Sequence, residues 1–382
     1  MLRTGSKIYW LSPIRIYLMR YLIAPDKFKG TLSASEVCQI LAQAVRTHNH
    51  GAQIDLAPIA DGGEGTAELV ASQLGAERRS IATVDALERS ISAEFFVHQN
   101  EGFIDMSSAS GLWRIPPSDR RPLDSNTFGT GLIVRHLWDL GIRRISIGLG
   151  GSATVDAGFG LAAAVGYSFL DKQGNSVRPV PTRFAAIEQV IPPNMNGLPD
   201  IIGLADVETR LLGPEGAIHV FGPQKGLGPD EIESLDRELT RLVDRIEASL
   251  GTNHSETIRS GAAGGFGYGI LTFLRGKLVS GFAEVARRLQ LSRRISAADV
   301  VITGEGKLDR QSLQGKGPFG VAEIARRVKK PIWVIAGTIE DTERIQEHFD
   351  KAVSVVDQSI TLEAALKDPA GALRQRAAAF WE

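Results

Sequence analysis

Two carboxylates stand in a loop made almost entirely of glycine in the stretch PIADGGEGT, residues 58–66. An apolar segment leads into Asp61, and a helix-like run follows Glu64. Glycine lets backbone N–H groups approach a ligand closely because it carries no Cβ. Carboxylates beside such amides are typical of a metal site or a proton-transfer site. We therefore take Asp61 and Glu64 as candidate catalytic residues.

Acidic residues also follow several other segments that are apolar enough to form buried strands. In open α/β sheets, ligands bind outside the carboxyl ends of the strands. A single acid at such an end can simply cap the next helix. Several acids together with several glycine loops fit a site for Mg²⁺ and phosphate better, because Mg²⁺ takes few protein carboxylates and relies on substrate phosphates. The acids at these ends are Asp26, Asp61, Glu64, Asp206, Glu305 and Asp309.

Lysines with a glycine nearby supply the positive charge that phosphates need. Lys27 and Lys29 lie in PDKFKG, Lys225 in FGPQKG and Lys307 in GEGKLD. At a strand-to-helix turn, backbone amides and the helix N-terminus add to the charge of such a lysine. The most glycine-dense run, GAAGGFGYG at 261–269, is followed at once by the apolar ILTFL. This favours a phosphate-cradling turn over a flexible linker.

One motif points to a different class of protein. The stretch GLGGSA, residues 148–153, fits the dinucleotide-binding pattern, and Asp171 follows at the spacing of a ribose-binding acid. A nicotinamide-dependent oxidoreductase is therefore an alternative. Asp156 and the glycines at 158 and 160 weaken it, because they interrupt the helix that should begin there. The same stretch is similar to the phosphate loop of the GHMP small-molecule kinases, although the rest of the chain does not support that fold.

The order of the expected elements indicates an α/β protein. Apolar segments with strand character alternate with helical patterns, the first of which begins at a capping box of Ser33 and Glu36. Such alternation implies a largely parallel sheet. The expected strands span 21–25, 54–60, 143–151, 201–206, 298–306 and 331–337; the expected helices begin after Ser33, after Glu64, at Asn126 and near Pro318.

Residues 76–115 have a different pattern, in which apolar and polar residues alternate between turns, as in antiparallel strands. We therefore expect a discontinuous α/β domain from residues 19–75 and 285–382, with a mixed α/β domain of residues 76–284 inserted, and an active site in the cleft between them. Residues 1–18 are basic without a secretory pattern, and we expect an N-terminal extension there, with Met19 opening the folded domain.

Composition excludes several classes of partner and site. The 43 Lys and Arg residues balance 44 Asp and Glu residues, which gives no reason to expect nucleic acid. Cys38 is the only cysteine, so an intramolecular disulfide and a multi-cysteine metal site are excluded, and a cytoplasmic location is favoured. No apolar run reaches the roughly 18 residues of a membrane span.

Eight motifs, taken together, are far more specific than any one of these loops. They closely resemble those of the type 1 glycerate kinases, a bacterial family that phosphorylates D-glycerate with ATP and Mg²⁺. The resemblance runs from Met19 to about Gly337 and implies a discontinuous Rossmann-like domain with an inserted α/β domain. In chain order the motifs are MRYLIAPDKFKGTLSA, PIADGGEGT, FIDMSSASGL, NTFGTG, GLGGSATVDAG, GPEGAIHVFGPQKG, GAAGGFGYG and DVVITGEGKLD.

The chain departs from the family pattern at two places. Ala157 replaces a glycine, and Glu208–Thr209 replaces an Asp-Asn pair after Asp206. If the second acid of that pair is a metal ligand in the family, Glu208 would substitute for it from a longer side chain. The geometry of a metal site is the property that this change puts in question.

The resemblance and the loops together assign candidate roles. We expect Asp61, Glu64 and Asp206 to be catalytic, with Asp61, Asp206 and Glu208 as Mg²⁺ ligands. The phosphates of ATP are expected at Gly150, Gly151, Ser152, Lys225, Gly264, Gly265, Glu305, Lys307 and Asp309, and the substrate at Asp26, Lys29, Ser110 and Arg114.

The expected reaction is phosphorylation of D-glycerate by ATP, with 2-phosphoglycerate favoured as the product. The expected partners are D-glycerate and ATP, without nucleic acid or membrane, and the chain is expected to be a monomer or homodimer. A non-catalytic nucleotide or sugar-acid sensor is the third hypothesis, after the kinase and the oxidoreductase.

Overall fold

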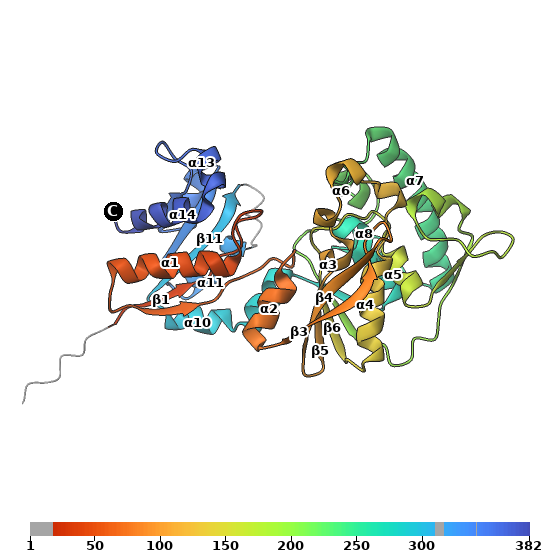
Figure 1. Cartoon of the computed structure of the whole chain (residues 1–382), viewed down its shortest axis with the longest axis horizontal. Coiled ribbons are helices and arrows are strands. Elements are labelled where there is room, and N and C mark those ends of the chain that lie inside the picture. The colour runs from red at the N-terminus through yellow and green to blue at the C-terminus, as the bar shows by residue number, and fades with distance from the viewer. Residues whose placement is uncertain (1–17, 310–316, 341) are drawn as a thin grey trace, which may run out of the picture.

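The computed structural model describes residues 18–309, 317–340 and 342–382, and it contains two α/β units side by side. In Figure 1 the unit on the left combines the red start and the blue end of the chain, and the unit on the right contains the sequence between them. The expectation of one unit built from both ends of the chain agrees with this arrangement. The expected extension at 1–18, apart from Leu18, lies outside the described residues.

The first unit is built on a five-stranded, fully parallel sheet in the order β13-β12-β11-β1-β2. The buried apolar residues 21–23 of β1 and 300–302 of β11 suit a sheet covered on both faces. The strands are β1 (Arg20–Ile23), β2 (Gln53–Leu56), β11 (Val300–Leu308), β12 (Ile332–Ile339) and β13 (Lys351–Ser354).

Helices cover both faces of this sheet. Alternate residues of β1 divide between two cores: Ile23 packs with α1 (Ala34–His48) and α14 (Pro369–Ala377), whereas Leu22 packs with α10 (Leu291–Ala297) and α11 (Gly317–Arg327). The chain therefore leaves β1 toward one face on its way to β2, and leaves β11 toward the other face on its way to β12. The strand order reverses between β1 and β11.

The second unit is built on a mixed six-stranded sheet in the order β10-β9-β6-β5-β4-β3. The strands β3, β4 and β5 pair antiparallel, which confirms the prediction for residues 76–115 as far as Asp105, after which α3 (Ser107–Ser110) and a 3₁₀ turn follow; the remaining neighbours pair parallel. The strands are β3 (Glu77–Val84), β4 (Ser90–His98), β5 (Glu101–Asp105), β6 (Arg144–Gly148), β9 (Asp200–Leu204) and β10 (Lys277–Val279).

Helices pack on this second sheet around one large apolar core that contains Phe95, Ile147 and Phe266. Its helices are α3 (Ser107–Ser110), α4 (Phe128–Asp139), α5 (Phe159–Ala164), α6 (Ala217–Lys225), α7 (Pro229–Leu250) and α8 (Ala262–Phe273). A separate two-stranded sheet pairs β7 (Ser168–Leu170) with β8 (Gln189–Ile191), and the remaining helices of the first unit are α12 (Thr342–Gln346) and α13 (Leu362–Lys367). Short 3₁₀ turns are η1 (Leu112–Arg114), η2 (Pro117–Asp119), η3 (Pro122–Asp124), η4 (Pro181–Ala186) and η5 (Ala378–Phe380).

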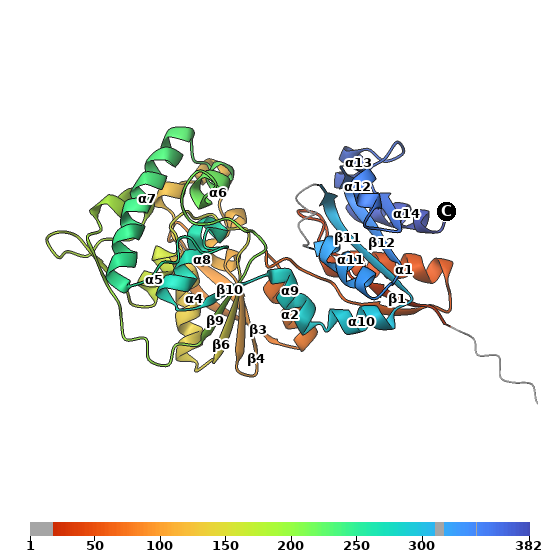
Figure 2. The same ribbon diagram turned by 180° about the vertical axis from the view of Figure 1, so that it is seen from behind.

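Two helices lie where the units meet. Figure 2 shows α2 (Thr66–Leu74) and α9 (Gly281–Arg288) side by side next to the second sheet. Val70 of α2 and Val285 of α9 share a core with Phe96 and Phe103 of that sheet. Because α2 packs on the second sheet, its packing favours a domain boundary before residue 66. The domain boundaries expected near residues 76 and 285 remain predictions.

The local predictions are mostly accurate, with corrections at the strand ends. The capping box of Ser33 and Glu36 opens α1, and Gly75 closes α2 in the left-handed region. The strand expected to continue to residue 60 ends at Leu56, although the Ala57 N–H still donates to the Ile23 carbonyl at 2.8 Å and the Ile59 N–H to the Pro25 carbonyl at 2.9 Å. The strand expected to end near Glu305 instead continues to Leu308, paired with β12 through Ile339.

Candidate functional site

The glycine loop at 61–65 is held at the junction of the two units. A Cβ on Gly62, whose φ is +87°, would lie 2.7 Å from the carbonyl oxygen of Leu204 at the end of β9. A Cβ on Gly281 would collide with the backbone of Asp61 and Gly62, so the start of α9 also packs on this loop. The Asp61 carboxylate accepts a hydrogen bond from the Gly63 N–H at 2.9 Å. Glycine at these positions lets the loop pass between two elements of the second unit.

Asp26, at the end of β1, brings a second carboxylate to the same place. Its backbone N–H donates to the Gly304 carbonyl at 2.8 Å, and its Oδ1 accepts from the Lys27 N–H at 2.6 Å. Burial, and then the negative charge of nearby Asp61, raise the pKa of Asp26 well above its usual range. The Lys27 Nζ donates to the Glu64 carbonyl oxygen and so connects the loop after β1 to the glycine loop.

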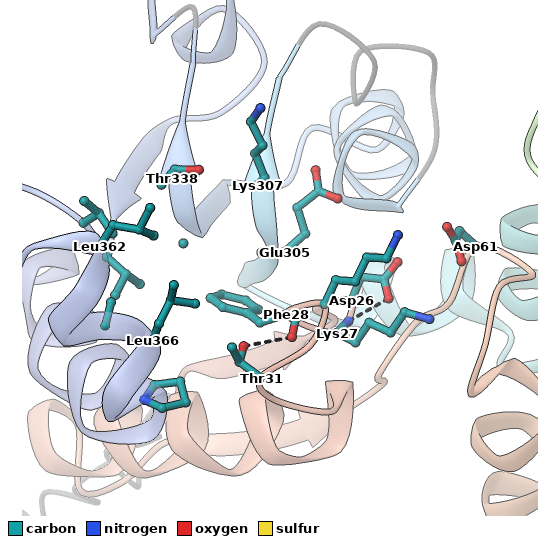
Figure 3. Close-up of a pocket in the computed structure, with 17 residues that line it drawn as sticks. Asp26, Lys27, Phe28, Thr31, Asp61, Glu305, Lys307, Thr338, Leu362 and Leu366 are labelled. Atoms are coloured by element: carbon teal, nitrogen blue, oxygen red, sulfur yellow. Dashed lines mark hydrogen bonds between the residues drawn. The ribbon is translucent and has the colours of Figure 1, made fainter. Parts of the chain in front are cut away.

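A pocket of about 330 Å³ opens beside these carboxylates in the first unit. Figure 3 shows Asp26, Lys27 and Asp61 toward one end of it, and Leu362 and Leu366 at the other. Lys29, Glu305 and Lys307 also line the pocket, as their assignment to substrate or ATP requires.

Lys307 and Asp309 interact with each other and with a third residue. The Lys307 Nζ lies 2.8 Å from a Glu340 carboxylate oxygen and 3.6 Å from one of Asp309. These two carboxylates raise the pKa of Lys307, Glu340 more than Asp309. Lys307 therefore lines the pocket as a cation whose charge is partly balanced by Glu340 and Asp309, two acids of the same unit.

The GLGGSA loop of the second unit packs directly on the glycine loop. A Cβ on Gly150 would lie 2.5 Å from the Gly63 Cα, and one on Gly151, whose φ is +67°, would lie 3.0 Å from a Glu64 carboxylate oxygen. A side chain larger than hydrogen at 150 would push the two backbones apart, whereas a Cβ at 63 would lie 2.8 Å from the Asp61 Oδ1. The structure thus brings Gly150, Gly151 and Glu64 together, as the sequence analysis expects of one site.

Lys225 is buried beneath the same loop. Its Nζ donates to the Ser152 Oγ at 2.8 Å and to the Thr154 carbonyl at 2.6 Å. Burial lowers the pKa of Lys225 to about 7, although nearby Asp156 acts in the opposite direction. A phosphate brought to this amine would restore its positive charge.

The glycine-dense run forms a kink next to Lys225. Residues 263–265 interrupt α8 with positive φ angles, and a Cβ on Gly264 would lie 2.7 Å from the Lys225 Nζ. The Gly264 carbonyl accepts from the Ala157 N–H at 3.1 Å, and a Cβ on Gly265 would lie 2.8 Å from the Ala157 Cα. The run is therefore a packed turn rather than a linker, and its role in holding phosphate remains a prediction.

Several acids at the carboxyl edge of the second sheet hold backbone in place. The carboxylate of Asp105, the last residue of β5, accepts from the Gly65 N–H at 2.9 Å and the Ala67 N–H at 3.1 Å. It therefore caps the N-terminus of α2. Burial raises the pKa of Asp105 to about 7. The Asp206 Oδ2 accepts from the Phe282 N–H at 2.8 Å at the start of α9. Sequence reasoning missed Asp105, although it closes the apolar FID segment of a motif.

Asp156 has a similar structural position. It is fully buried and accepts hydrogen bonds from the Thr127 N–H at 2.8 Å, the Thr127 Oγ1 at 2.7 Å and the Gly160 N–H at 2.9 Å. Burial raises the pKa of Asp156, and these hydrogen bonds oppose the rise. The acid that interrupts the dinucleotide-binding pattern therefore joins two loops.

Most candidates outside the first sheet do not line the pocket, among them Ser110, Arg114 and Glu208; the others are Glu64, Gly150, Gly151, Ser152, Asp206, Lys225, Gly264, Gly265 and Asp309. Ser110 is fully buried, and its Oγ lies 2.7 Å from the Thr130 Oγ1. The Arg114 guanidinium stacks 4.4 Å from the Trp113 ring centroid and donates to the Ser92 carbonyl at 3.2 Å. Their segment still lies along the GLGGSA loop, because the Ala153 N–H donates to the Ser110 carbonyl at 2.8 Å. Glu208 is exposed.

The expected metal ligands do not form a dense cluster. Within the described ranges, no three His, Cys, Asp or Glu side chains converge as a metal site would require. The set Asp61, Asp206 and Glu208 is therefore not gathered around one point there, and a Mg²⁺ site remains a prediction.

The comparisons with known proteins cover nearly the whole chain. A model of the glycerate kinase family matches residues 21–382. The chain belongs to the glycerate kinase family. A glycerate kinase of Bacillus subtilis (strain 168) is 35% identical, over 92% of this chain and 94% of its own. A glycerate 2-kinase of Escherichia coli (strain K12) is 36% identical, over 91% of this chain and 93% of its own.

A solved structure agrees with these relatives. The crystal structure of a glycerate kinase 2 from Salmonella typhimurium LT2 superposes with a TM-score of 0.81 at 36% identity, covering 95% of this chain and 97% of the other. The resemblance found in the motifs and the α/β fold class are confirmed. The chain is a kinase of this family, and its membership of the family supports glycerate as the compound that it phosphorylates.

Membrane association was not expected from the sequence. None of the helices in the described part of the chain combines the length and apolar character that crossing a membrane requires. The cytoplasmic location and the oligomeric state remain predictions.

Proposed function

We propose that the chain transfers the γ-phosphoryl group of ATP to a hydroxyl group of D-glycerate, with Mg²⁺, and releases 2-phosphoglycerate. The observation that carries this proposal is the junction of Asp26, Asp61 and Lys27 against the GLGGSA loop. Two carboxylates, one amine and two glycine loops from both units meet there. This arrangement offers a base, a cationic group and close backbone at one point between the units.

Phosphoryl transfer requires positioning and neutralisation of charge more than covalent chemistry. Asp61 lies at the edge of the pocket, where its carboxylate can accept the proton of the attacking glycerate hydroxyl. Lys27 and Lys29 would stabilise the negative charge of the transferred group, and Lys29 can instead pair with the glycerate carboxylate. Glu64 and Asp206 would act by fixing the loops on either side.

The residues present fit a Mg²⁺ ion held by few protein ligands. Asp26 and Asp61 are close enough for the charge of Asp61 to raise the pKa of Asp26, so a divalent cation near both would relieve their repulsion. When bound, the ion would neutralise charge on the phosphate oxygens. Asp61 is the ligand that we retain from the expected set, and Asp26 is the residue that we add to it.

A direct assay tests the proposal. Purified protein with ATP, Mg²⁺ and D-glycerate should release ADP, and ³¹P NMR should identify 2-phosphoglycerate rather than 3-phosphoglycerate. Absence of glycerate-dependent ADP release would leave the sensor hypothesis. Release of the 3-phosphate would reject only the proposed position of transfer.

The oxidoreductase alternative has less structural support. Asp171, the expected ribose-binding acid, accepts from the Gln173 N–H and the Asn175 N–H at 2.8 Å each within its own turn. Gly150 of the dinucleotide pattern packs on Gly63. Asp171 and Gly150 are both engaged in contacts within the protein. We therefore expect no NADH-dependent reduction of hydroxypyruvate.

A further inference from the structure

The pocket of the first unit lies where the strand order of its sheet reverses. From β1 the chain proceeds through α1 to β2, and from β11 it proceeds toward α11 and β12 on the opposite face. Loops leaving two adjacent parallel strands toward opposite faces leave a crevice between them at the carboxyl ends. Phe28 and Lys29 from the loop after β1, and Gly306 and Lys307 from β11, line the pocket at this point.

The two ends of this pocket differ in chemistry. Asp26, Lys27 and Asp61 line the end that faces the glycine loop. Leu362 and Leu366 line the opposite end, with the ring of Phe28 between (Figure 3), and Val355 and Val356 also line the pocket. A pocket with one charged and one apolar end fits a ligand that has the same asymmetry.

Two leucines of the apolar end are exposed although both are large and hydrophobic. Leu362 and Leu366 lie four residues apart on α13, hence on one face of the helix, and their exposed fractions are 53% and 58%. Ala365 between them is buried in the core of the unit and fixes the helix there. The apolar face that α13 turns to the pocket is therefore rigidly placed and open to a ligand.

Backbone packs closely against backbone at two glycines that line the pocket, Gly306 and Gly337. A Cβ on Gly306 would lie 3.1 Å from the Lys29 N, and one on Gly337 would collide with the Gly306 carbonyl. The glycines at these positions allow β11 and β12 to approach each other and the loop after β1 without side chains between. The volume of about 330 Å³ is at the lower end of small-molecule pockets.

We infer that the purine base of the nucleotide binds in this pocket, against Leu362 and Leu366, with its phosphates directed past Lys27 toward Asp61. This inference rests on the proposed function, since it names where the phosphoryl donor sits. If the base binds here, the residues expected to bind ATP fall into two groups, one in each unit. Glu305 and Lys307 lie at the nucleotide, whereas Lys225 and Gly264 lie on the far side of the glycine loop, in the unit that faces the donor's phosphates.

Calorimetric titration of the full chain tests the inference with two ligands. The double variant Leu362→Gln with Leu366→Gln keeps side-chain size and removes apolar contact with a base. Its Kd for ADP should rise by about tenfold, while its Kd for inorganic tripolyphosphate, which has no base, should change by less than about twofold. In steady-state assays the KM for ATP should rise and the KM for D-glycerate should stay the same.

A matched control places the same changes on the other unit. Leu140 and Ile191 are each 48% exposed and lie in the second unit. The double variant Leu140→Gln with Ile191→Gln should leave every one of these constants unchanged. Because all four positions are exposed, both double variants should fold, which circular dichroism and thermal melting will verify.

The outcomes separate this inference from the proposed function. An unchanged Kd for ADP in the folded Leu362/Leu366 variant, or an equal loss of tripolyphosphate binding, overturns the inference even if the enzyme phosphorylates glycerate. If the wild type binds ADP, loses it in that variant alone and yet phosphorylates no glycerate, the inference stands and the proposed function falls.

Discussion

The carboxyl edges of the two sheets contain similar residue types with different surroundings. At the edge of the second sheet, Asp105, Asp156 and Asp206 each accept backbone N–H groups that fix a loop or a helix start. At the edge of the first sheet, Asp26 and Asp61 lie beside a pocket and close to each other. The comparison teaches that an acid at a strand end becomes informative about chemistry only when its hydrogen bonds and its access to a cavity are known.

Among the substitutions that test this difference between the two sheet edges, the one at Asp61 should have the largest effect on activity. Asp61→Asn preserves the shape and can still accept from the Gly63 N–H, but it removes the negative charge. If Asp61 takes the proton of glycerate or binds Mg²⁺, kcat should fall by a factor of roughly 10²–10⁴, about 3–5 kcal/mol of transition-state stabilisation. The measurements are kcat at saturating Mg²⁺-ATP and the thermal midpoint, which should not change. Near-normal kcat in the folded variant would remove Asp61 from the site.

Lys225 tests whether a buried group of the second unit also acts on phosphate. Lys225→Met should lower kcat by about a hundredfold if the amine meets a phosphate. Because the folded pKa of Lys225, about 7, is below its unfolded value, the unfolded chain binds more protons between roughly pH 7 and pH 10, and wild-type stability rises with pH there. The stability advantage of Lys225→Met should therefore be greatest below pH 7 and shrink toward pH 10. A variant with full activity would make Lys225 purely structural.

For Asp105 we expect the opposite dependence of stability on pH, and an effect on stability alone. Its folded pKa of about 7 exceeds its usual value of 3.8, so its contribution to stability is greatest below pH 4 and is lost as the pH rises to 7. Denaturant unfolding of the wild type and Asp105→Asn should show a difference in unfolding free energy that moves by about 2–3 kcal/mol in favour of the variant between pH 5 and pH 8. The exposed Asp139→Asn serves as the control. A difference independent of pH would contradict the assignment.

The smallest effect is expected at the helix that carries the two exposed leucines. The Thr361 Oγ1 accepts from the Ala364 N–H at 3.2 Å and caps α13. Thr361→Ala should cost about 1 kcal/mol locally and raise the Kd for ADP by a few fold, since Leu362 and Leu366 would be held less firmly. Thr361→Ser keeps the cap and should restore both values. Weakened ADP binding that Thr361→Ser does not restore would show that the cap is not the cause.

Much of the fold follows from local patterns in the chain. Ser33 and Glu36 form a capping box, and Gly75 closes α2, because these interactions lie within one helical turn. The apolar runs of β1 and β11 require burial on both faces, which only a parallel sheet between helices supplies. The strand ends were less predictable, since the extent of β11 is set by its pairing with β12, whose sequence lies far along the chain.

The candidate site was predicted in part. Asp61, Lys29 and Glu305 were expected at one edge and all line the pocket. Ser110 was expected at the substrate, but its hydroxyl lies in the core against Thr130, and no pattern around Ser110 reveals that partner. Leu362 was not singled out, because an exposed leucine on a short helix has no distinctive sequence signal.

By itself, the sequence determined the residue types that end each strand and the glycines that let backbone pass close to backbone, because both are consequences of local chemistry. Only the tertiary structure decided which carboxylates serve which purpose. Asp105 caps α2 across about forty residues of chain, and Asp26 faces Asp61 because β1 and β2 are adjacent. Hydrogen bonding and charge repulsion act over a few ångströms in space, so their partners are fixed by strand order rather than by distance along the chain.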